Sequence, residues 1–246
     1  MKPPVDLRPH RRRRAGGQRW HEHNSARRTA ILAAAIALVE ELGPTADIST
    51  QQIAERAGLA RSVIYRQFDH REDLDNHARE FVFEHYLAEF ESVLVLDPGR
   101  TAEEIIFEVM STVVRWTTEH TNLYRFGQLG PLPGQSADSL CTFRERIADT
   151  LWERFTTVTT ILGIDAEPFH PLVHGLVGLV EGVVAQHLSR SSRPDQDTIA
   201  RLLTSSTWFL LDGHARDLGY TFDRTATVGV LLGELLATAS DRTAES

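Results

Sequence analysis

The chain has 246 residues, of which 41% are hydrophobic and 24% are charged, and its formal net charge is -8. This composition is typical of a globular chain that buries a core and excludes a disordered or fibrous one. Cys141 is the only cysteine, which excludes an internal disulfide and a cysteine-based zinc site.

No run of about 18 uncharged apolar residues and no apolar secretory signal stands out in the sequence. We therefore expect a cytoplasmic protein with no membrane partner.

The charge is distributed unevenly along the chain. Residues 1–80 hold 14 basic and 11 acidic side chains, whereas residues 81–246 hold 12 and 23. Residues 1–23 are rich in arginine and lack apolar periodicity, so they predict a disordered basic arm. Such asymmetry is typical of a basic end that meets a polyanion and an acidic body that does not, although a merely solvated tail is the alternative.

The first predicted helix begins at Asn24 or Ser25 and ends at Gly43-Pro44, because apolar residues recur at helical spacing up to Leu42. Arg27 and Arg28 lie in its first turn, where positive charge opposes the helix dipole. A nearby phosphate would remove this conflict.

Two short helices follow. Ser49 and Gln52 have the spacing of a capping box, and Gly58 can take the left-handed conformation that ends a helix. A third helix from Arg61 to Phe68 completes a helix-turn-helix. In that motif the second helix enters the major groove, so base contacts are expected from Arg61 and Ser62. The expected phosphate contacts are Ser49, Thr50, Tyr65, Arg66 and Arg71. A half-buried structural role is the alternative for Tyr65.

The stretches ILAAAIALVEELG (31–43), STQQIAERAGLARSVIYRQF (49–68) and HREDL (70–74) resemble the DNA-binding domain of TetR-family transcriptional regulators. The resemblance implies that Thr50, Arg61, Ser62, Tyr65 and Arg66 contact DNA and that Arg71 holds a phosphate. It also implies an all-helical homodimer. Ala60 departs from the usual Ser or Thr cap of the recognition helix, which should weaken that helix end by about 1 kcal/mol.

Beyond residue 70 every periodic segment predicts a helix, so the expected fold is all-α. A linker helix is expected at 71–94. The further helices are expected at 101–119, 121–127, 136–161, 168–190, 196–218 and 224–240. The predicted organisation is an arm (1–23), a helix-turn-helix domain (24–70) and a helical ligand-binding and dimerisation domain (71–246).

Small residues recur along one face of the 168–190 helix, namely Gly175, Gly178, Gly182 and Ala185. Glycine inside a helix costs up to about 1 kcal/mol relative to alanine, so close packing against another helix is the simplest reason for this face. The resemblance implies a four-helix dimer interface with the 196–218 helix, which carries Trp208 and Phe209. Packing within one chain is the alternative.

Within the resemblance, a small-molecule cavity lies among the helices from 101 to 190, since large apolar side chains with a few polar groups suit such a site. The candidate lining residues are Phe107, Met110, Arg115, Trp116, His120, Tyr124, Phe126, Phe143, Trp152 and His174. For each of them a core position is the competing interpretation. Arg115 or Arg125 is a candidate partner for an anionic ligand group.

The predicted function is a repressor that binds a pseudo-palindromic operator in double-stranded DNA as a homodimer and is released by a small-molecule effector. The alternative is a helix-turn-helix regulator with no small-molecule ligand, acting constitutively or through a protein partner. We expect neither an enzyme nor a cofactor, because the sequence has no phosphate-binding glycine loop and no nucleophile elbow. His170 and His174 have a metal-ligand spacing, but no third ligand is evident, so we expect no metal site.

Overall fold

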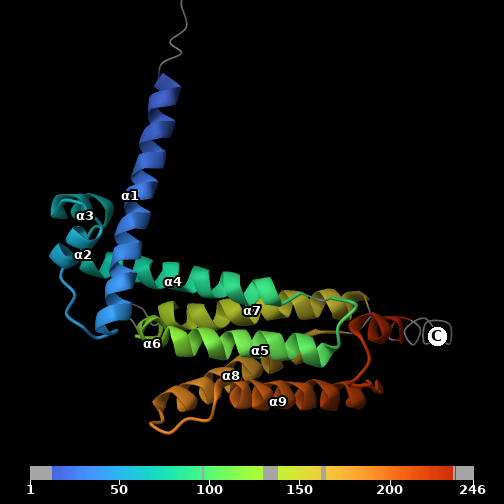
Figure 1. Cartoon of the computed structure of the whole chain (residues 1–246). Helices are drawn as coiled ribbons and strands as arrows, with labels where there is room; N and C mark the ends of the chain where they lie inside the picture. The colour runs from blue at the N-terminus through green and yellow to red at the C-terminus, as the bar shows by residue number, and fades with distance from the viewer. Residues whose placement is uncertain (1–12, 96, 130–137, 162–164, 235, 237–246) are drawn as a thin grey trace, which may run out of the picture. The chain divides into compact units, whose positions relative to one another are not determined.

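The computed structural model describes residues 13–95, 97–129, 138–161, 165–234 and 236, and within these ranges the side chains of 13–24, 138–143, 158 and 161 are not described. The described residues form helices joined by short loops (Figure 1). Their only β-type pairing is an isolated antiparallel bridge between Thr101 and Thr227. The all-α prediction is therefore confirmed.

The chain divides into two compact units, residues 1–81 and 82–246. The boundary lies inside a helix, α4 (Arg71–Val93), rather than at residue 71. Leu74 and Ala78 of α4 are fully or almost fully buried. The start of α4 thus belongs to the first unit and the rest to the second.

The first unit contains α1 (Arg13–Leu42), α2 (Thr50–Arg56), α3 (Arg61–Gln67) and the start of α4. Its core contains one fully buried side chain from each helix, namely Ile31, Ile53, Ile64 and Leu74. Gly58 has φ +64° between α2 and α3, and the Leu59 amide donates to the Ala54 carbonyl at 2.9 Å. These features end α2 as the sequence predicted, because glycine tolerates the left-handed region.

Helix α1 begins at Arg13 and not at Asn24 or Ser25. Residues 13–23, expected to be part of a disordered arm, continue the helix upstream, and residues 1–12 of that arm lie outside the described part. Extending an existing helix requires no new nucleation and no apolar stripe. A search for apolar periodicity therefore locates only the part of α1 that packs on the core.

The second unit contains the rest of α4 and α5 (Ala102–Glu119), α6 (Thr121–Gln128), α7 (Asp138–Ile161), α8 (His170–Ser189) and α9 (Gln196–Asp217), with a short 3-10 turn at Glu167–Phe169. Residues 228–234 are also helical. Helix α5 packs mainly on α9, and α7 packs on α8. The bounds of α5 to α9 agree with the sequence prediction to within a few residues, whereas the helix predicted at 224–240 begins at residue 228 and its predicted end lies outside the described residues.

The segment after α9 returns to the loop between α4 and α5. The amides of Val228 and Gly229 donate to the carbonyls of Arg100 and Pro98 at 2.8 and 3.0 Å. The guanidinium of Arg224 makes two hydrogen bonds of 2.6 and 2.7 Å to the Glu103 carboxylate. Residues 98–103 are therefore fastened to residues 224–229, which lie more than a hundred positions later.

Candidate DNA interface and ligand cavity

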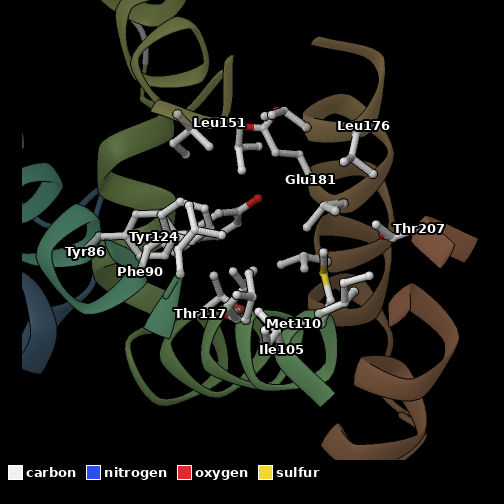
Figure 2. Close-up of a pocket in the computed structure, with 18 of the residues that line it drawn as sticks. Tyr86, Phe90, Ile105, Met110, Thr117, Tyr124, Leu151, Leu176, Glu181 and Thr207 are labelled. Carbon is white, nitrogen blue, oxygen red and sulfur yellow. Dashed lines mark hydrogen bonds between the residues drawn. The ribbon is translucent and has the colours of Figure 1, made fainter. Parts of the chain in front are cut away.

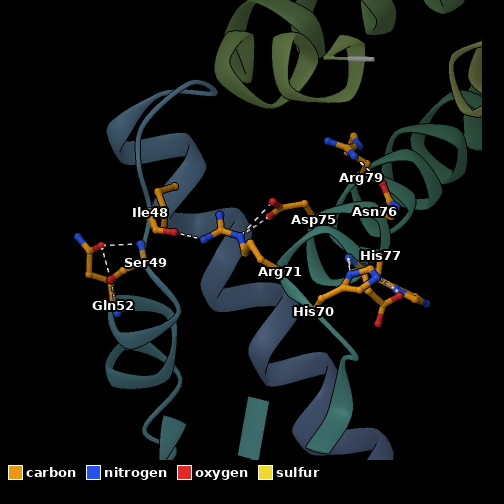
Figure 3. Close-up of polar contacts among 10 residues, drawn as sticks. Ile48, Ser49, Gln52, His70, Arg71, Asp75, Asn76, His77 and Arg79 are labelled. Carbon is orange, nitrogen blue, oxygen red and sulfur yellow. Dashed lines mark hydrogen bonds and ion pairs between the residues drawn. The ribbon is translucent and has the colours of Figure 1, made fainter. Parts of the chain in front are cut away.

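Helix α2 begins with the predicted capping box. The backbone amide of Gln52 donates to Ser49 Oγ at 3.2 Å, and the backbone amide of Ser49 donates to the side-chain oxygen Oε1 of Gln52 at 2.8 Å (Figure 3). The Ser49 side chain is thus engaged with its own helix. Its predicted phosphate contact would have to share the hydroxyl with this cap.

The N-terminus of α3 has no side-chain cap. Ala60 has the extended backbone of an N-cap residue (φ -71°, ψ 141°), and its carbonyl accepts from the Val63 amide at 2.8 Å. Its methyl group cannot accept a hydrogen bond from the free amides of the first turn. The N-terminus of α3 therefore lacks the expected capping hydrogen bond, although the backbone of Ala60 has the geometry of an N-cap residue.

Helix α3 has a buried side and an exposed side. Val63 and Ile64 are buried in the first unit, while Arg61, Ser62, Tyr65 and Arg66 are exposed. Half of the surface of Tyr65 is accessible, so this side chain is not a core residue. All four α3 residues that were expected to meet DNA lie on the open side.

A hydrogen-bonded triangle joins α2 to this exposed side. The Arg61 guanidinium donates to Tyr65 Oη at 2.9 Å and to Thr50 Oγ1 at 3.2 Å, and Thr50 Oγ1 lies 3.2 Å from Tyr65 Oη. The hydrogen bond with Thr50, then that from Arg61, lowers the pKa of the Tyr65 phenol. The three side chains are thus held together before any partner is bound, which lowers the ordering cost of binding.

Two of the predicted phosphate-binding arginines make internal contacts. Arg28 donates to the Gln67 carbonyl at 2.8 Å and lies 4.5 Å from the centre of the Phe68 ring. Arg71 donates to the Ile48 carbonyl, and its Nε lies 2.9 and 3.0 Å from the two carboxylate oxygens of Asp75 (Figure 3). These contacts give both arginines a role in fixing helices of the unit. Arg27, by contrast, is exposed.

The second unit contains an apolar cavity of about 200 Å³. Figure 2 shows Tyr86, Phe90 and Tyr124 on one side of it and Leu176 and Thr207 on the other, with Glu181 near the top. The rest of its wall is mostly aliphatic, and α5 contributes Ile105, Ile106, Val109, Met110 and Val113. This lining suits a hydrophobic molecule.

A second cavity of about 450 Å³ shares Tyr124 and Glu181 with the first and is more polar. Its charged lining residues are Arg144, Glu145 and Glu181. Arg144 Nε donates to Glu181 Oε2 at 2.6 Å. A ligand in the apolar cavity would therefore lie next to a polar space at Glu181.

Burial affects the hydroxyl groups around the apolar cavity. It raises the pKa of Tyr86, and it raises the pKa of Tyr124 to about 12, with the negative charge of Glu181 contributing to both shifts. The Tyr124 hydroxyl has no hydrogen bond of normal geometry, although nearby Gln128 partly offsets the rise. Thr207 Oγ1 is also buried without a partner. The Thr207 hydroxyl of this wall is thus free for a ligand.

The predicted cavity residues are only partly brought together. Met110 and Tyr124 line the apolar cavity, and Trp116, Tyr124 and His174 line the polar one. The residues that line neither are Phe107, Arg115, His120, Phe126 and Trp152. The side chain of Phe143 lies outside the described residues.

The residues away from the cavities have other contacts. Arg115 pairs with Glu89 at 3.2 Å and Glu119 at 3.5 Å, and Phe107 lies beneath the guanidinium of Arg201 at 4.8 Å. Arg125 Nη2 lies 3.4 Å from the Leu188 carbonyl. Neither Arg115 nor Arg125 lines the apolar or the polar cavity, so neither is placed to meet a ligand in these two spaces.

Sequence reasoning missed most of the aliphatic wall because it weighted aromatic residues. Ile105, Val109 and Val113 recur every four residues on one face of α5. That spacing was a usable signal for one lining face, but the same pattern describes an ordinary core.

The small residues of α8 face open space in the single chain. A side-chain carbon added at Gly175, Gly178 or Gly182 would meet no other atom within 4 Å, and Ala185 is exposed. On α9, Phe209 is 64% exposed, whereas Trp208 is buried within the chain at 7%. Packing among the described residues of one chain therefore does not account for this face of α8.

The segment Glu167–Ser189 is long and apolar enough, by length and composition alone, to cross a membrane, and 17% of its most apolar window is buried in the single chain. The segment contains Glu167 and Glu181, so it is not an uncharged apolar run of the kind that the sequence analysis considered.

His170 and His174 lie close together, with ring centres 4.9 Å apart. The His170 ring also contacts Trp152 edge to face at 4.9 Å. Within the described residues, no group of three or more His, Cys, Asp or Glu side chains is arranged to hold a metal ion.

Residues 31–77 match the family model described as bacterial regulatory proteins, tetR family. No curated protein sequence matches the chain. The matched segment contains α2, α3 and the contacts of Arg61, Tyr65 and Arg71 described above.

Several solved structures share the fold. A tetR-family transcriptional regulator from Streptomyces coelicolor is similar with a TM-score of 0.62 at 18% identity, covering 87% of this chain and 89% of that one. The regulator FadR from Bacillus subtilis in complex with stearoyl-CoA has a TM-score of 0.54 at 19% identity, covering 75% and 98%. The multidrug binding protein EbrR complexed with imidazole has a TM-score of 0.52 at 18% identity, covering 73% and 93%. At these identities the likeness concerns the fold.

Proposed function

We propose that this chain, a tetR-family transcriptional regulator, is a repressor that binds a pseudo-palindromic operator as a homodimer and leaves it when a small molecule fills the cavity of the second unit. The observation that carries the proposal is the exposed side of α3, where Arg61, Ser62, Tyr65 and Arg66 stand beside Thr50.

The DNA-binding part rests on how these side chains are presented. Arginine can pair with both acceptors on the major-groove edge of guanine, and a hydroxyl can bond several base edges or a phosphate. Because Thr50 and Tyr65 hold the Arg61 guanidinium, its direction is restricted before DNA is met. We assign Arg61 and Ser62 to bases, and Thr50, Tyr65 and Arg66 to the backbone.

The homodimer is supported by the uncovered apolar surface of α8 and α9. The glycines of α8 leave room for the backbone of another helix, and Phe209 of α9 offers a large exposed aromatic ring. A second copy of the chain would cover both surfaces, and two-fold symmetry would bring two α3 helices to a palindromic site. The same contact accounts for an apolar α8 without a membrane.

Control by a ligand is supported by the apolar cavity and by the unpartnered Thr207 hydroxyl in its wall. A ligand releases DNA only if it binds more tightly to a conformation that fits DNA poorly. Related folds were solved with stearoyl-CoA and with imidazole, so the fold by itself does not define the ligand. A regulator without a ligand is the second candidate, and the unpartnered Thr207 hydroxyl in the wall of the cavity favours the first.

The experiment begins with selection of bound fragments from random DNA, which tests sequence preference and half-site spacing together. Fluorescence anisotropy with the selected site should then show at least tenfold weaker binding for Arg61→Ala, since a bidentate base contact is worth about 1–3 kcal/mol. Arg154→Ala removes a similar charge from an exposed arginine of α7 and should bind DNA normally. Equal affinity of the Arg61 and Arg154 variants would contradict the assignment.

A further inference from the structure

The charges around the apolar cavity have one sign. Glu181 is the only charged residue among the described residues that line it, and its side chain is 17% exposed. The other polar groups there are neutral hydroxyls. A carboxylate in a mostly apolar wall is costly unless a positive group neutralises it.

The neighbouring polar cavity does not reverse this sign. It is lined by two glutamates, Glu145 and Glu181, against one arginine, Arg144. The Arg144 guanidinium already pairs with Glu181 and does not line the apolar cavity. An anionic head group would therefore meet more negative than positive charge in either space.

We propose that the effector is an amphipathic organic cation, a small hydrophobic body in the apolar cavity with a protonated amine that donates hydrogen bonds to the Glu181 carboxylate. This inference rests on the proposed function, since it takes that cavity as the effector site. It adds the chemical class of the ligand and the residue that selects it.

The surroundings of Glu181 suit such a group. Tyr86, Phe90 and Tyr124 form an aromatic wall of the same cavity, and the face of an aromatic ring attracts a cation within about 6 Å. Both phenols are neutral at pH 7, because the ordinary pKa of tyrosine is already about 10, so they add no charge to that of Glu181.

Arg144 must give way to the ligand, and its environment permits this. Its side chain is 57% exposed, so the guanidinium can be hydrated when it leaves the Glu181 carboxylate. The ligand amine would replace the guanidinium at Glu181, and Arg144 would turn into solvent. Arg144 and the ligand thus compete for the same carboxylate.

The test compares n-octylamine, n-octanol and octanoate, which share an eight-carbon body and differ in head-group charge. Isothermal titration calorimetry with the full chain at pH 7 should give at least tenfold tighter binding for octylamine than for octanoate, with octanol between them. Glu181→Gln should weaken octylamine at least tenfold and leave octanol unchanged. Glu153→Gln, which removes an exposed carboxylate of α7 outside both cavities, should change none of the three.

Arg144→Gln distinguishes a cationic ligand selected by Glu181 from an anionic ligand selected by Arg144. If Glu181 selects a cation, removal of the competing guanidinium tightens octylamine binding. If Arg144 selects an anion, the same change abolishes octanoate binding. Tighter binding of octanoate than of octylamine by the unaltered protein, or no binding of octylamine, overturns the inference.

Release of operator DNA is measured separately by anisotropy with the same octylamine. Glu181-dependent binding without DNA release would leave the cation site standing and contradict its role as the effector site. DNA release by octanoate alone would support ligand control and overturn the cationic class.

Discussion

A serine at position 60 should stabilise the start of α3. The backbone of Ala60 already has N-cap geometry, its side chain is exposed, and no side chain caps the first turn. A serine hydroxyl there can accept from an amide of the first turn without a change in the backbone. Restoring a cap of this kind is worth about 1 kcal/mol, within a range of about 0.5–2.

Amide hydrogen exchange measures this locally, because fraying of a helix end is a local opening. One kcal/mol corresponds to about a fivefold change in the opening equilibrium, so the α3 amides of Ala60→Ser should exchange about five times more slowly. Ser49→Ala is the reciprocal control, since it removes the capping box of α2 and should speed exchange there by a similar factor. Unchanged or faster exchange in α3 of the Ala60 variant would refute the reasoning.

Three further outcomes are expected. Arg71→Met should lower the free energy of unfolding by about 1–2 kcal/mol in urea titrations, because it removes charged hydrogen bonds to the Asp75 carboxylate and the Ile48 carbonyl. An unchanged urea midpoint would instead favour an arginine that only binds DNA. Phe209→Glu should make the chain monomeric in sedimentation, whereas Leu42→Glu, at an exposed position of the first unit, should not; association that survives Phe209→Glu would contradict the proposed interface. Burial lowers the pKa of the His187 imidazole below its usual 6.5, so this imidazole binds a proton more readily in the unfolded chain than in the folded one. Stability from neutral His187 is then fully present above pH 6.5 and declines as the pH falls below it, and His187→Gln should flatten that decline in thermal melts between pH 7 and 5.

The features that the sequence predicted well depend on near neighbours. The capping box at Ser49 joins residues three apart, and the turn at Gly58 is decided by the backbone of one glycine. Spacing and residue type carry all the information that such features need. The open side of α3 follows in the same way from Val63 and Ile64 on its other side.

The features that it missed depend on distant parts of the chain. Arg28 reaches a carbonyl 39 positions away and Arg71 one 23 positions away, so no local pattern marks them as internal. The cavity is still harder to predict from the sequence, because an apolar face of α5 has the same residue pattern whether it packs against side chains or lines a cavity. Only the arrangement of six helices makes Glu181 the single charged side chain among the described residues of that wall.

The contact between residues 98–103 and 224–229 bears on the order in which the two units fold during synthesis. The first unit is complete within its first 81 residues, so it can fold while the rest of the chain is still being made. The second unit cannot close until Arg224 and Gly229 have left the ribosome and reached Glu103 and Pro98. During that interval the apolar face of α5 lacks its final partner. The period of greatest exposure to aggregation therefore belongs to the second unit, which holds the apolar cavity.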